Sequence, residues 1–222
     1  MGGVNSCKLL SVRLPGEKPQ TGVSSRIESF SDNVFAFALT LLVLTIKVPT
    51  IPAGDHPGFL LEQLVAQWPS YITYVISFVT ILLTWINHHV MFERVQKADH
   101  ALMFLNGMML LPVTLVPFPT SLLAVFIVHP QARYAAALFA GSYGLIVGMY
   151  FLVWRHITRL NKAQGIIEDD ERIQRLTKKI RLVFALYLGA LILAFIYPLA
   201  CIAACFLLVV YLALPELRNA EE

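Results

Sequence analysis

Charged side chains are scarce in this sequence. Only 14% of its 222 residues are Asp, Glu, Lys or Arg, whereas 57% are hydrophobic, and the mean hydropathy is +0.68. A soluble domain usually has about 25% charged and about 45–50% apolar residues, so a soluble single domain is nearly excluded. The hydrophobic residues form blocks of about 16 to 21, close to the length of a membrane-spanning helix. The sequence therefore predicts an integral membrane protein with several spans.

Motifs of catalysis and energy coupling are also missing. The six His residues form no HExxH-type box, and the three Cys suggest no metal site. There is no GxxxxGK[ST] or GxGxxG phosphate-binding motif and no GxSxG nucleophile elbow. The small net charge of +3, without a basic and aromatic patch, gives no indication of nucleic-acid binding. We therefore expect no enzyme and no cofactor, which leaves a channel, a secondary transporter or an assembly factor.

The apolar residues delimit six segments, at 30–48, 71–90, 101–119, 134–154, 181–197 and 199–214. The last two would form one helix of about 50 Å, against a hydrocarbon core of about 30 Å, unless Pro198 separates them. We therefore expect an all-α fold with six transmembrane helices in one domain over 26–215. A flexible N-terminal tail (1–25) and a C-terminal tail (216–222) would flank it.

Lys and Arg residues lie almost entirely on one side of this arrangement. Four precede the first span, two lie between spans 2 and 3, eight lie between spans 4 and 5 including their edges, and one follows the last span. The opposite loops contain only Lys47 and Arg133. The positive-inside rule therefore predicts that both termini are cytoplasmic.

No Asp or Glu lies near the centre of a predicted span, where a carrier would often place one. The K⁺-filter sequence TVGYG is absent as well. A channel with this sequence would therefore need a different architecture from channels with a carbonyl-lined filter.

The first span opens with Arg26-x-x-x-Phe30-Ser31-Asp32. This RxxxFSD pattern resembles the signature of the transmembrane protein 175 family of potassium channels, whose prokaryotic members are short six-helix chains. Residues 35–42, the Trp-Ile-Asn-His-His stretch at 85–89, Leu105-Asn106 and residues 117–120 also agree with the family pattern. The resemblance covers roughly residues 26–120, while spans 4 to 6 agree only in number and hydrophobicity.

This resemblance implies a K⁺-preferring leak channel in the bacterial plasma membrane, with membrane lipid around it. Single-repeat chains such as this one would form homotetramers with the first helix around the central pore. By position, the narrowest point would be Phe37, followed by apolar rings at Leu41 and Leu44. A phenylalanine stands where the family often has isoleucine or leucine, so the pore width expected at Phe37 differs from the family pattern.

Helix geometry agrees with this assignment in part. At 100° per residue, one stripe of the first helix contains Phe30, Asn33, Phe37, Thr40, Leu41 and Leu44. Asn33 and Thr40 would then be polar residues lining the pore. The same spacing is also typical of ordinary lipid or helix packing. We expect Ala36 and Val43 on the opposite face, where substitutions would act on stability first.

Polar residues of three spans should meet at the cytoplasmic membrane edge. These are Arg26, Ser31, Asp32, His88, His89 and Asn106. Asp32 lies about 140° from Phe37 on an ideal helix, so it should point away from the pore. A shared hydrogen-bond network would satisfy these groups, because unpaired polar groups at that depth are costly. Alternatively, the histidines simply extend to the interface.

Two other classes of function stay open at this stage. A secondary carrier could couple protons to a substrate through the polar cluster, and it would show a saturable, substrate-dependent flux. A non-conducting membrane scaffold would show no ion flux at all.

Overall fold

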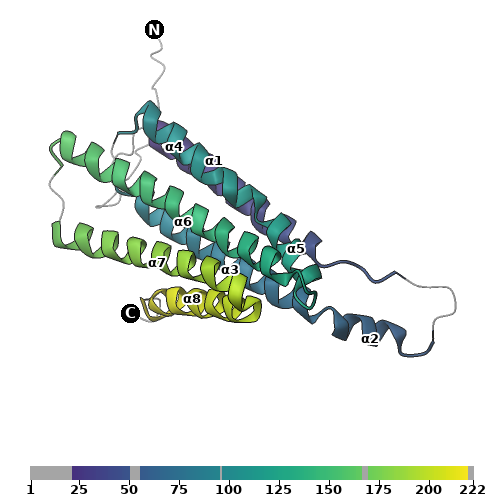
Figure 1. Ribbon diagram of the computed structural model, residues 1–222. Coiled ribbons are helices and arrows are strands. Elements are labelled where there is room, and N and C mark those ends of the chain that lie inside the picture. The colour runs from purple at the N-terminus through teal and green to yellow at the C-terminus, as the bar shows by residue number, and fades with distance from the viewer. Residues whose placement is uncertain (1–21, 51–55, 96, 167–169, 220–222) are drawn as a thin grey trace, which may run out of the picture.

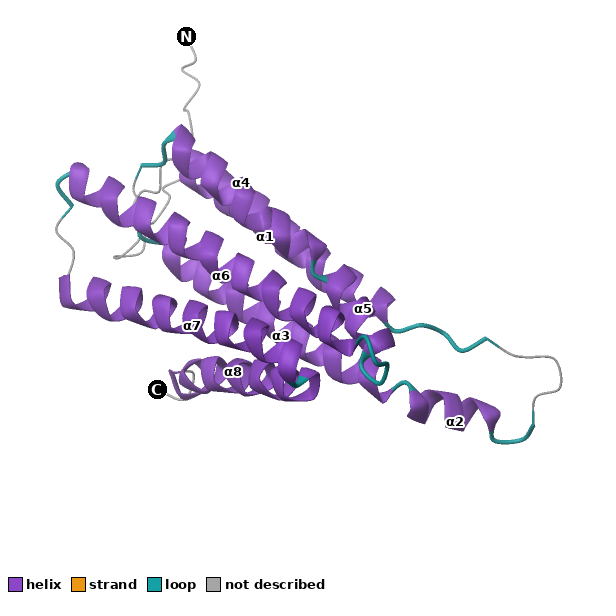
Figure 2. Cartoon of the chain, in the orientation of Figure 1, coloured by secondary structure: helices purple, strands orange, loops and turns teal. Residues whose placement is uncertain are grey.

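A computed structural model describes residues 22–50, 56–95, 97–166 and 170–219, and the regular secondary structure in these ranges is entirely helical (Figure 2). The elements are α1 (Gly22–Leu41), the 3₁₀ helix η1 (Leu42–Thr45), α2 (Phe59–Ala66), α3 (Trp68–Phe92), α4 (His100–Leu115), α5 (Pro117–Phe126), α6 (Ala132–Ala163), α7 (Asp170–Ile196) and α8 (Pro198–Asn219). Most of the predicted N-terminal tail lies outside the described residues, but 22–25 already belong to α1. The predicted C-terminal tail is helical through residue 219.

The long helices form an elongated bundle (Figure 1). α6 is central, since it packs against α4, α5, α7 and α8. α1 packs against α3 and α4 at one side of the bundle, and α8 runs back along α7. The start of α1 and the end of α8 therefore lie at the same end, while the short helix α2 lies beyond the other end (Figure 1).

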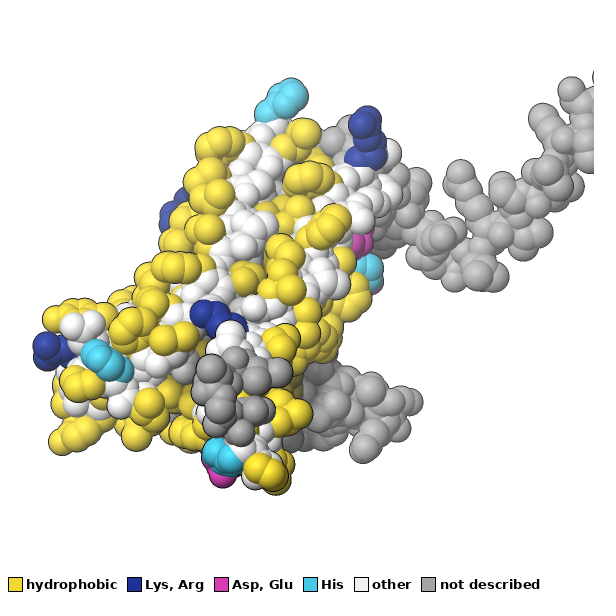
Figure 3. Space-filling model, turned by 90° about the vertical axis from the view of Figure 1, so that its right-hand side faces the viewer, with side chains coloured by type: hydrophobic (Ala, Val, Ile, Leu, Met, Phe, Trp, Pro, Cys, Tyr) yellow, Lys and Arg dark blue, Asp and Glu magenta, His cyan; other side chains and the backbone are white. Residues whose placement is uncertain are grey.

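Five helical segments of the described chain are long and apolar enough to cross a membrane. They are Ser24–Thr45, Trp68–Phe92, His100–Phe126, Ala132–Ala163 and Asp170–Ile196. A sixth apolar helix, Pro198–Ala213, is shorter. Hydrophobic side chains cover much of the face drawn in Figure 3, and charged side chains there are few and scattered. Such a surface is typical of a protein that meets lipid or partner chains.

Prolines begin helices in this fold. α7 ends at Ile196 and α8 begins at Pro198, so the long C-terminal apolar run is divided into two helices at the predicted place. Pro117 likewise begins α5, and helix continues to Phe126 rather than ending at 119 as the sequence suggested. The reason is that proline lacks an N–H, which the first turn of a helix does not use.

α6 and α7 continue beyond the apolar segments of the sequence. α6 runs to Ala163, and α7 begins at Asp170 with two acids in its first turn, where they suit the helix dipole. The Asn161 side chain donates to the carbonyl oxygen of Arg94 (3.0 Å) and the Gln164 side chain to that of Lys97 (3.3 Å). The end of α6 is thereby fixed to the connection between α3 and α4.

A histidine–carboxylate contact joins α6 to the start of α4. Asp99 caps α4 by accepting the backbone N–H of Leu102 (2.7 Å), and Nε2 of His156 lies 3.0 Å from each Asp99 carboxylate oxygen. Partial burial alone would raise the pKa of Asp99. The hydrogen bonds from Leu102 and His156 outweigh this effect, so the pKa of Asp99 is lowered.

Candidate pore helix and its polar network

α1 has one face buried in the subunit and a broad exposed surface. Phe35 and Leu42 are fully buried against α3, α4 and their neighbours. Phe37 and Leu44 are 69% and 71% exposed, and Leu41 is 46% exposed. The stripe singled out in the sequence, Phe30, Asn33, Phe37, Thr40, Leu41 and Leu44, is exposed along its whole length. The single chain therefore leaves a largely apolar stripe of α1 free for a pore, a partner chain or lipid.

The two polar residues of this stripe present oxygen atoms outward. Asn33 uses its side-chain N–H to donate to the carbonyl oxygen of Ser29 (2.8 Å), and Thr40 donates its hydroxyl proton to the carbonyl oxygen of Phe37 (2.9 Å). One N–H of the Asn33 amide and the hydroxyl proton of Thr40 are thus used within α1. In the described part of the chain their acceptor oxygens take no hydrogen bond, so these oxygens can face water or a cation.

The stripe ends beside a shallow groove. Leu41 and Leu44 border it from α1 and η1, and Thr114, Leu115 and Phe118 border it from α4 and α5. Leu115 and Phe118 are themselves exposed. The apolar surface of α1 is therefore continuous with that of α4 and α5 at this end.

Ala36 and Val43, which we expected to lie opposite the stripe and to affect stability first, are not packed against the subunit. Ala36 is exposed, and Val43 is 53% exposed. α1 packs against α3 and α4 on one side only, so an arc around Phe35, Ala38 and Leu42 is buried while more than half of the helix surface stays open. A helix with two packing partners has one buried arc rather than two opposite faces.

Behind the exposed stripe, three buried polar side chains form a hydrogen-bonded chain. The Asn106 side-chain N–H donates to Oγ of Ser31 (2.8 Å), which donates to the carbonyl oxygen of Ile27 (2.8 Å). Oδ1 of Asn106 is then an acceptor for Nε2 of His88, at 2.9 Å. The chain links α1, α4 and α3. His88 is also packed between Phe35 and Phe92, whose ring centroids lie 5.4 and 4.3 Å away.

Asp32 and Arg26, both expected in the polar network, have different surroundings. Asp32 is half-buried and accepts a hydrogen bond from the indole N–H of Trp85 (2.8 Å) on α3. Arg26 is exposed and forms no ion pair with a described residue. Its predicted place in the network is wrong, because six helical residues separate it from Asp32 by about 120°. Arg26 lies instead near the stripe of Phe30.

The second histidine has a partner that the sequence analysis missed. Nδ1 of His89 lies 2.7 Å from a carboxylate oxygen of Glu28, and its Nε2 lies 3.6 Å from Glu93. Glu28 is largely buried although it is charged. Its position four residues before Asp32 could have indicated that both carboxylates face α3, because residues at that spacing share a helix face. Trp85 as the donor to Asp32 could not be assigned without the three-dimensional contact.

The described residues of this site do not form a metal-binding site. Within the described ranges, no group of three or more His, Cys, Asp or Glu is placed to hold a metal ion. The arrangement therefore has two parts. One is the exposed, largely apolar stripe of α1, and the other is the set of side-chain hydrogen bonds that connects α1 to α3 and α4.

The sequence of this chain is similar to those of known proteins. A potassium channel of Chamaesiphon minutus is 42% identical to this chain over 198 residues, which are 89% of this chain and 97% of that protein. The family model described as endosomal/lysosomal potassium channel TMEM175 matches residues 26–117. The chain belongs to the TMEM175 family. TMEM175 proteins are ion channels and not enzymes.

The fold agrees with TMEM175 structures. The crystal structure of a lysosomal potassium-selective channel TMEM175 homolog from C. minutus superposes with a TM-score of 0.78 at 41% identity, covering 87% of this chain and 97% of that one. A human protein named endosomal/lysosomal proton channel TMEM175 is 34% identical over 111 residues, which are 48% of this chain but only 22% of the human protein. The chain thus corresponds to nearly the whole bacterial protein and to a part of the human one.

The residues matched by the TMEM175 family model are the ones that build this site. They begin at Arg26 and include α1, η1, α3 and α4, which carry the exposed stripe, the Ser31–Asn106–His88 chain and the Asp32–Trp85 contact. The central helix α6, together with α7 and α8, lies outside the match.

Proposed function

We propose that this protein is a potassium-preferring leak channel that assembles as a homotetramer, with α1 of each subunit around a central pore. The observation that carries the proposal is the exposure of Phe37, Leu41 and Leu44 on a helix whose other side is buried in the subunit. The potassium-channel name of the C. minutus relative supports K⁺ as the permeant ion.

In this proposal the four Phe37 side chains form the narrowest ring. An apolar ring offers no oxygen to replace the water of an ion, so a narrow ring resists hydration and blocks conduction. Asn33 lies about one turn before Phe37 and Thr40 about one turn after it, and both present acceptor oxygens. Such oxygens on either side of the ring favour cations over anions. Leu41 and Leu44 form wider apolar rings further along.

The membrane arrangement that fits this pore has six spans with both termini in the cytoplasm. α8 has 22 residues, or about 33 Å at 1.5 Å per residue, and its apolar part Pro198–Ala213 accounts for about 24 Å of a core of about 30 Å, with the polar end of the helix at the membrane edge. The distribution of Lys and Arg then orients the basic end toward the cytoplasm, and the bacterial relatives favour the plasma membrane. Tags at both termini should be protected from impermeant reagents in intact cells. An accessible C-terminal tag would refute the six-span arrangement.

The pore assignment is tested by ion flux through purified protein in liposomes. Phe37→Ala should raise the K⁺ leak severalfold and weaken discrimination between K⁺ and Na⁺, because a smaller ring admits water. Leu41→Ala and Leu44→Ala should have smaller effects. Phe195→Ala is a matched control, since Phe195 is an exposed phenylalanine of α7, which lies away from α1.

Each variant must be compared at equal tetramer content. Unchanged conductance and ion preference in Phe37→Ala would mean that the stripe only packs against lipid or protein, and the pore assignment would be refuted. A tetramer that carries no ions under any condition would instead favour the scaffold.

Proton permeation is a second candidate, favoured by two observations. The human relative is named a proton channel, and His88, His89 and Glu28 lie on the helices that surround α1 or in α1 itself. A pH-sensitive dye inside the same liposomes would detect proton entry. Proton flux that saturates and requires a co-substrate would favour a carrier over a channel.

A further inference from the structure

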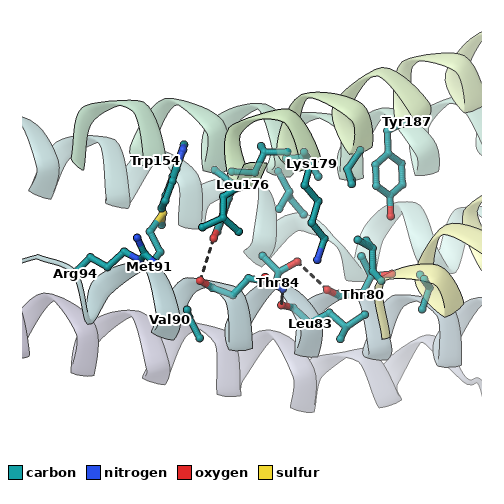
Figure 4. A pocket seen from close by; sticks show the side chains of 18 residues that line it. Thr80, Leu83, Thr84, Val90, Met91, Arg94, Trp154, Leu176, Lys179 and Tyr187 are labelled. Carbon is teal, nitrogen blue, oxygen red and sulfur yellow. Dashed lines mark hydrogen bonds between the residues drawn. The ribbon is translucent and has the colours of Figure 1, made fainter. Parts of the chain in front are cut away.

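A separate cavity lies on the other side of α3 from the α1 network. It has a volume of about 140 Å³ and lies where α3 faces α6 and α7 (Figure 4). Val209 and Leu212 of α8 also line it. It is partly open to the protein surface. None of the stripe residues of α1 borders it, so the proposed conduction path leaves it unexplained.

Most of the cavity wall is apolar. Leu83, Ile146, Val147, Leu176, Ile180 and Val183 are among the side chains that line it. Its volume is similar to that of an engineered apolar cavity of about 150 Å³ that stays dry and binds benzene. A cavity of this size and lining can hold a section of one hydrocarbon chain, but not a large polar solute.

Two cations also line this apolar cavity, and they set it apart from a simple packing defect. Lys179 points from α7 into the cavity, and Arg94 lies at the end of α3 with its guanidinium 5.6 Å from the ring centroid of Trp154 (Figure 4). Both are half-buried. None of the described residues that line the cavity is acidic, and neither cation forms an ion pair with a described residue.

Most of the other polar groups of the wall already have partners, but the buried Tyr187 hydroxyl has none among the described residues. The Thr84 hydroxyl donates to the carbonyl oxygen of Thr80 (2.7 Å) and the Asn87 amide to that of Leu83 (2.6 Å). The Tyr150 hydroxyl donates to the carbonyl oxygen of Asn87 (3.0 Å). The donors left for a ligand therefore include the cationic groups of Arg94 and Lys179 and the neutral Tyr187 hydroxyl. Desolvated cations at membrane depth are costly unless an anion accompanies them.

We propose that this cavity binds an anionic phospholipid. One acyl chain enters between α3 and α7 and packs on the apolar wall, and the phosphate pairs with the ammonium group of Lys179, which points into the cavity (Figure 4). Arg94 lines the cavity further along, beside Met91, and adds positive charge there. This combination of an apolar slot and cationic side chains matches an amphiphile with one negative headgroup. The topology proposed above would place the headgroup in the cytoplasmic leaflet, but the binding itself requires only that the bundle is embedded in a membrane.

Trp154 provides a direct reporter, because it borders the cavity and is almost fully buried. The full-length protein is reconstituted in phosphatidylcholine membranes that contain a small fraction of one brominated lipid. In one sample this lipid is phosphatidylglycerol and in the other it is phosphatidylcholine, each brominated on the upper part of one acyl chain. Bromine quenches tryptophan fluorescence on contact. We expect phosphatidylglycerol to quench at severalfold lower mole fraction than phosphatidylcholine. Trp154→Phe should abolish the difference between the two lipids.

The variants distinguish specific lipid binding in the cavity from general electrostatic attraction of anionic lipid to a basic surface. In Lys179→Gln, brominated phosphatidylglycerol should quench tryptophan fluorescence only at the mole fraction that brominated phosphatidylcholine requires. Lys178→Gln is the matched control, since Lys178 precedes Lys179 in α7 but is exposed and does not line the cavity. Val147→Phe keeps both cations and fills the cavity, so it should also abolish the preference. Unchanged thermal unfolding midpoints verify that the variants are folded.

Three outcomes would overturn the proposal. Equal quenching by the two brominated lipids would mean that no anionic headgroup is recognised. An equal loss in Lys178→Gln would mean that only surface charge attracts the lipid. Displacement of brominated phosphatidylglycerol by oleate but not by unlabelled phosphatidylglycerol would identify a fatty-acid site. If Val147→Phe fails to fold, the comparison of Lys179→Gln with Lys178→Gln decides alone.

Discussion

The buried chain of Ser31, Asn106 and His88 should fix α1 to its neighbours, and Asn106→Leu tests this. The substitution keeps approximate size but removes both hydrogen bonds that Asn106 makes, to Ser31 (2.8 Å) and to His88 (2.9 Å). Side-chain hydrogen bonds between membrane helices contribute about 0.6 kcal/mol on average and about 1.7 kcal/mol at most. We therefore expect Asn106→Leu to lower the free energy of unfolding by about 1–3 kcal/mol, toward the upper end because the N–H of His88 stays buried without an acceptor.

The free energy of unfolding can be measured in mixed micelles by titration with a denaturing detergent. Asn33→Ala is the matched control, because Asn33 is exposed and donates only to Ser29 within its own helix. It should cost less than about 0.5 kcal/mol. The double variant His88→Leu with Asn106→Leu should be more stable than the sum of the single effects predicts, since no buried donor is then left unpaired. If Asn106→Leu costs no more than Asn33→Ala, the network does not stabilise α1 and the reasoning fails.

Two further predictions concern the rest of the bundle. Asp99→Asn keeps a helix cap but loses the charge beside His156. Because the pKa of Asp99 is lowered in the folded chain, this charge stabilises the fold at all pH values above its unfolded pKa near 4, and the effect is lost as pH falls through the folded pKa. Wild type should melt higher than Asp99→Asn at pH 7, and the difference should shrink as the pH is lowered below 4; a pH-independent difference would contradict this. A Cβ at Gly144 would make an ordinary 3.6 Å contact, while one at Gly148 would lie 3.1 Å from the Phe184 ring. Gly144→Ala should therefore be neutral or stabilising by up to about 1 kcal/mol, with Gly148→Ala less favourable in the same unfolding assay, and the reverse order would refute the packing argument.

Hydropathy and helix periodicity were sufficient for the coarse fold but not for its helix ends. An apolar segment must match the membrane core, so the sequence shows where such helices lie and why Pro198 divides the last two. A helix can continue past the membrane wherever its residues tolerate helical geometry, and hydropathy does not report this. α6 therefore extends to Ala163 without a signal in the apolar pattern. The extension of α5 to Phe126 does follow an apolar run, 122–128, which the boundary set at 119 left out.

Helix geometry predicted which residues of α1 share a face, but not which residues of other helices they contact. The 100° rule places Phe37, Leu41 and Leu44 on one stripe, and the stripe is exposed. Applied consistently, the same rule separates Arg26 from Asp32 by about 120°, which would have excluded their pairing. The partners that α1 finds on other helices, Trp85 for Asp32 and Asn106 for Ser31, depend on helix packing and were outside the reach of sequence periodicity.

The polar network explains how α1 keeps its orientation. Both Phe35 on the buried side and Phe37 on the exposed side are large and apolar, so burial of apolar surface alone would distinguish poorly between two rotations of the helix that differ by two residues. The bonds from Asn106 to Ser31 and from Trp85 to Asp32 are directional, and rotation of α1 would break both. Buried polar groups can select one arrangement in this way even where they add little net stability. A loosened network should therefore disturb conduction through the Phe37 stripe without any change in the stripe itself.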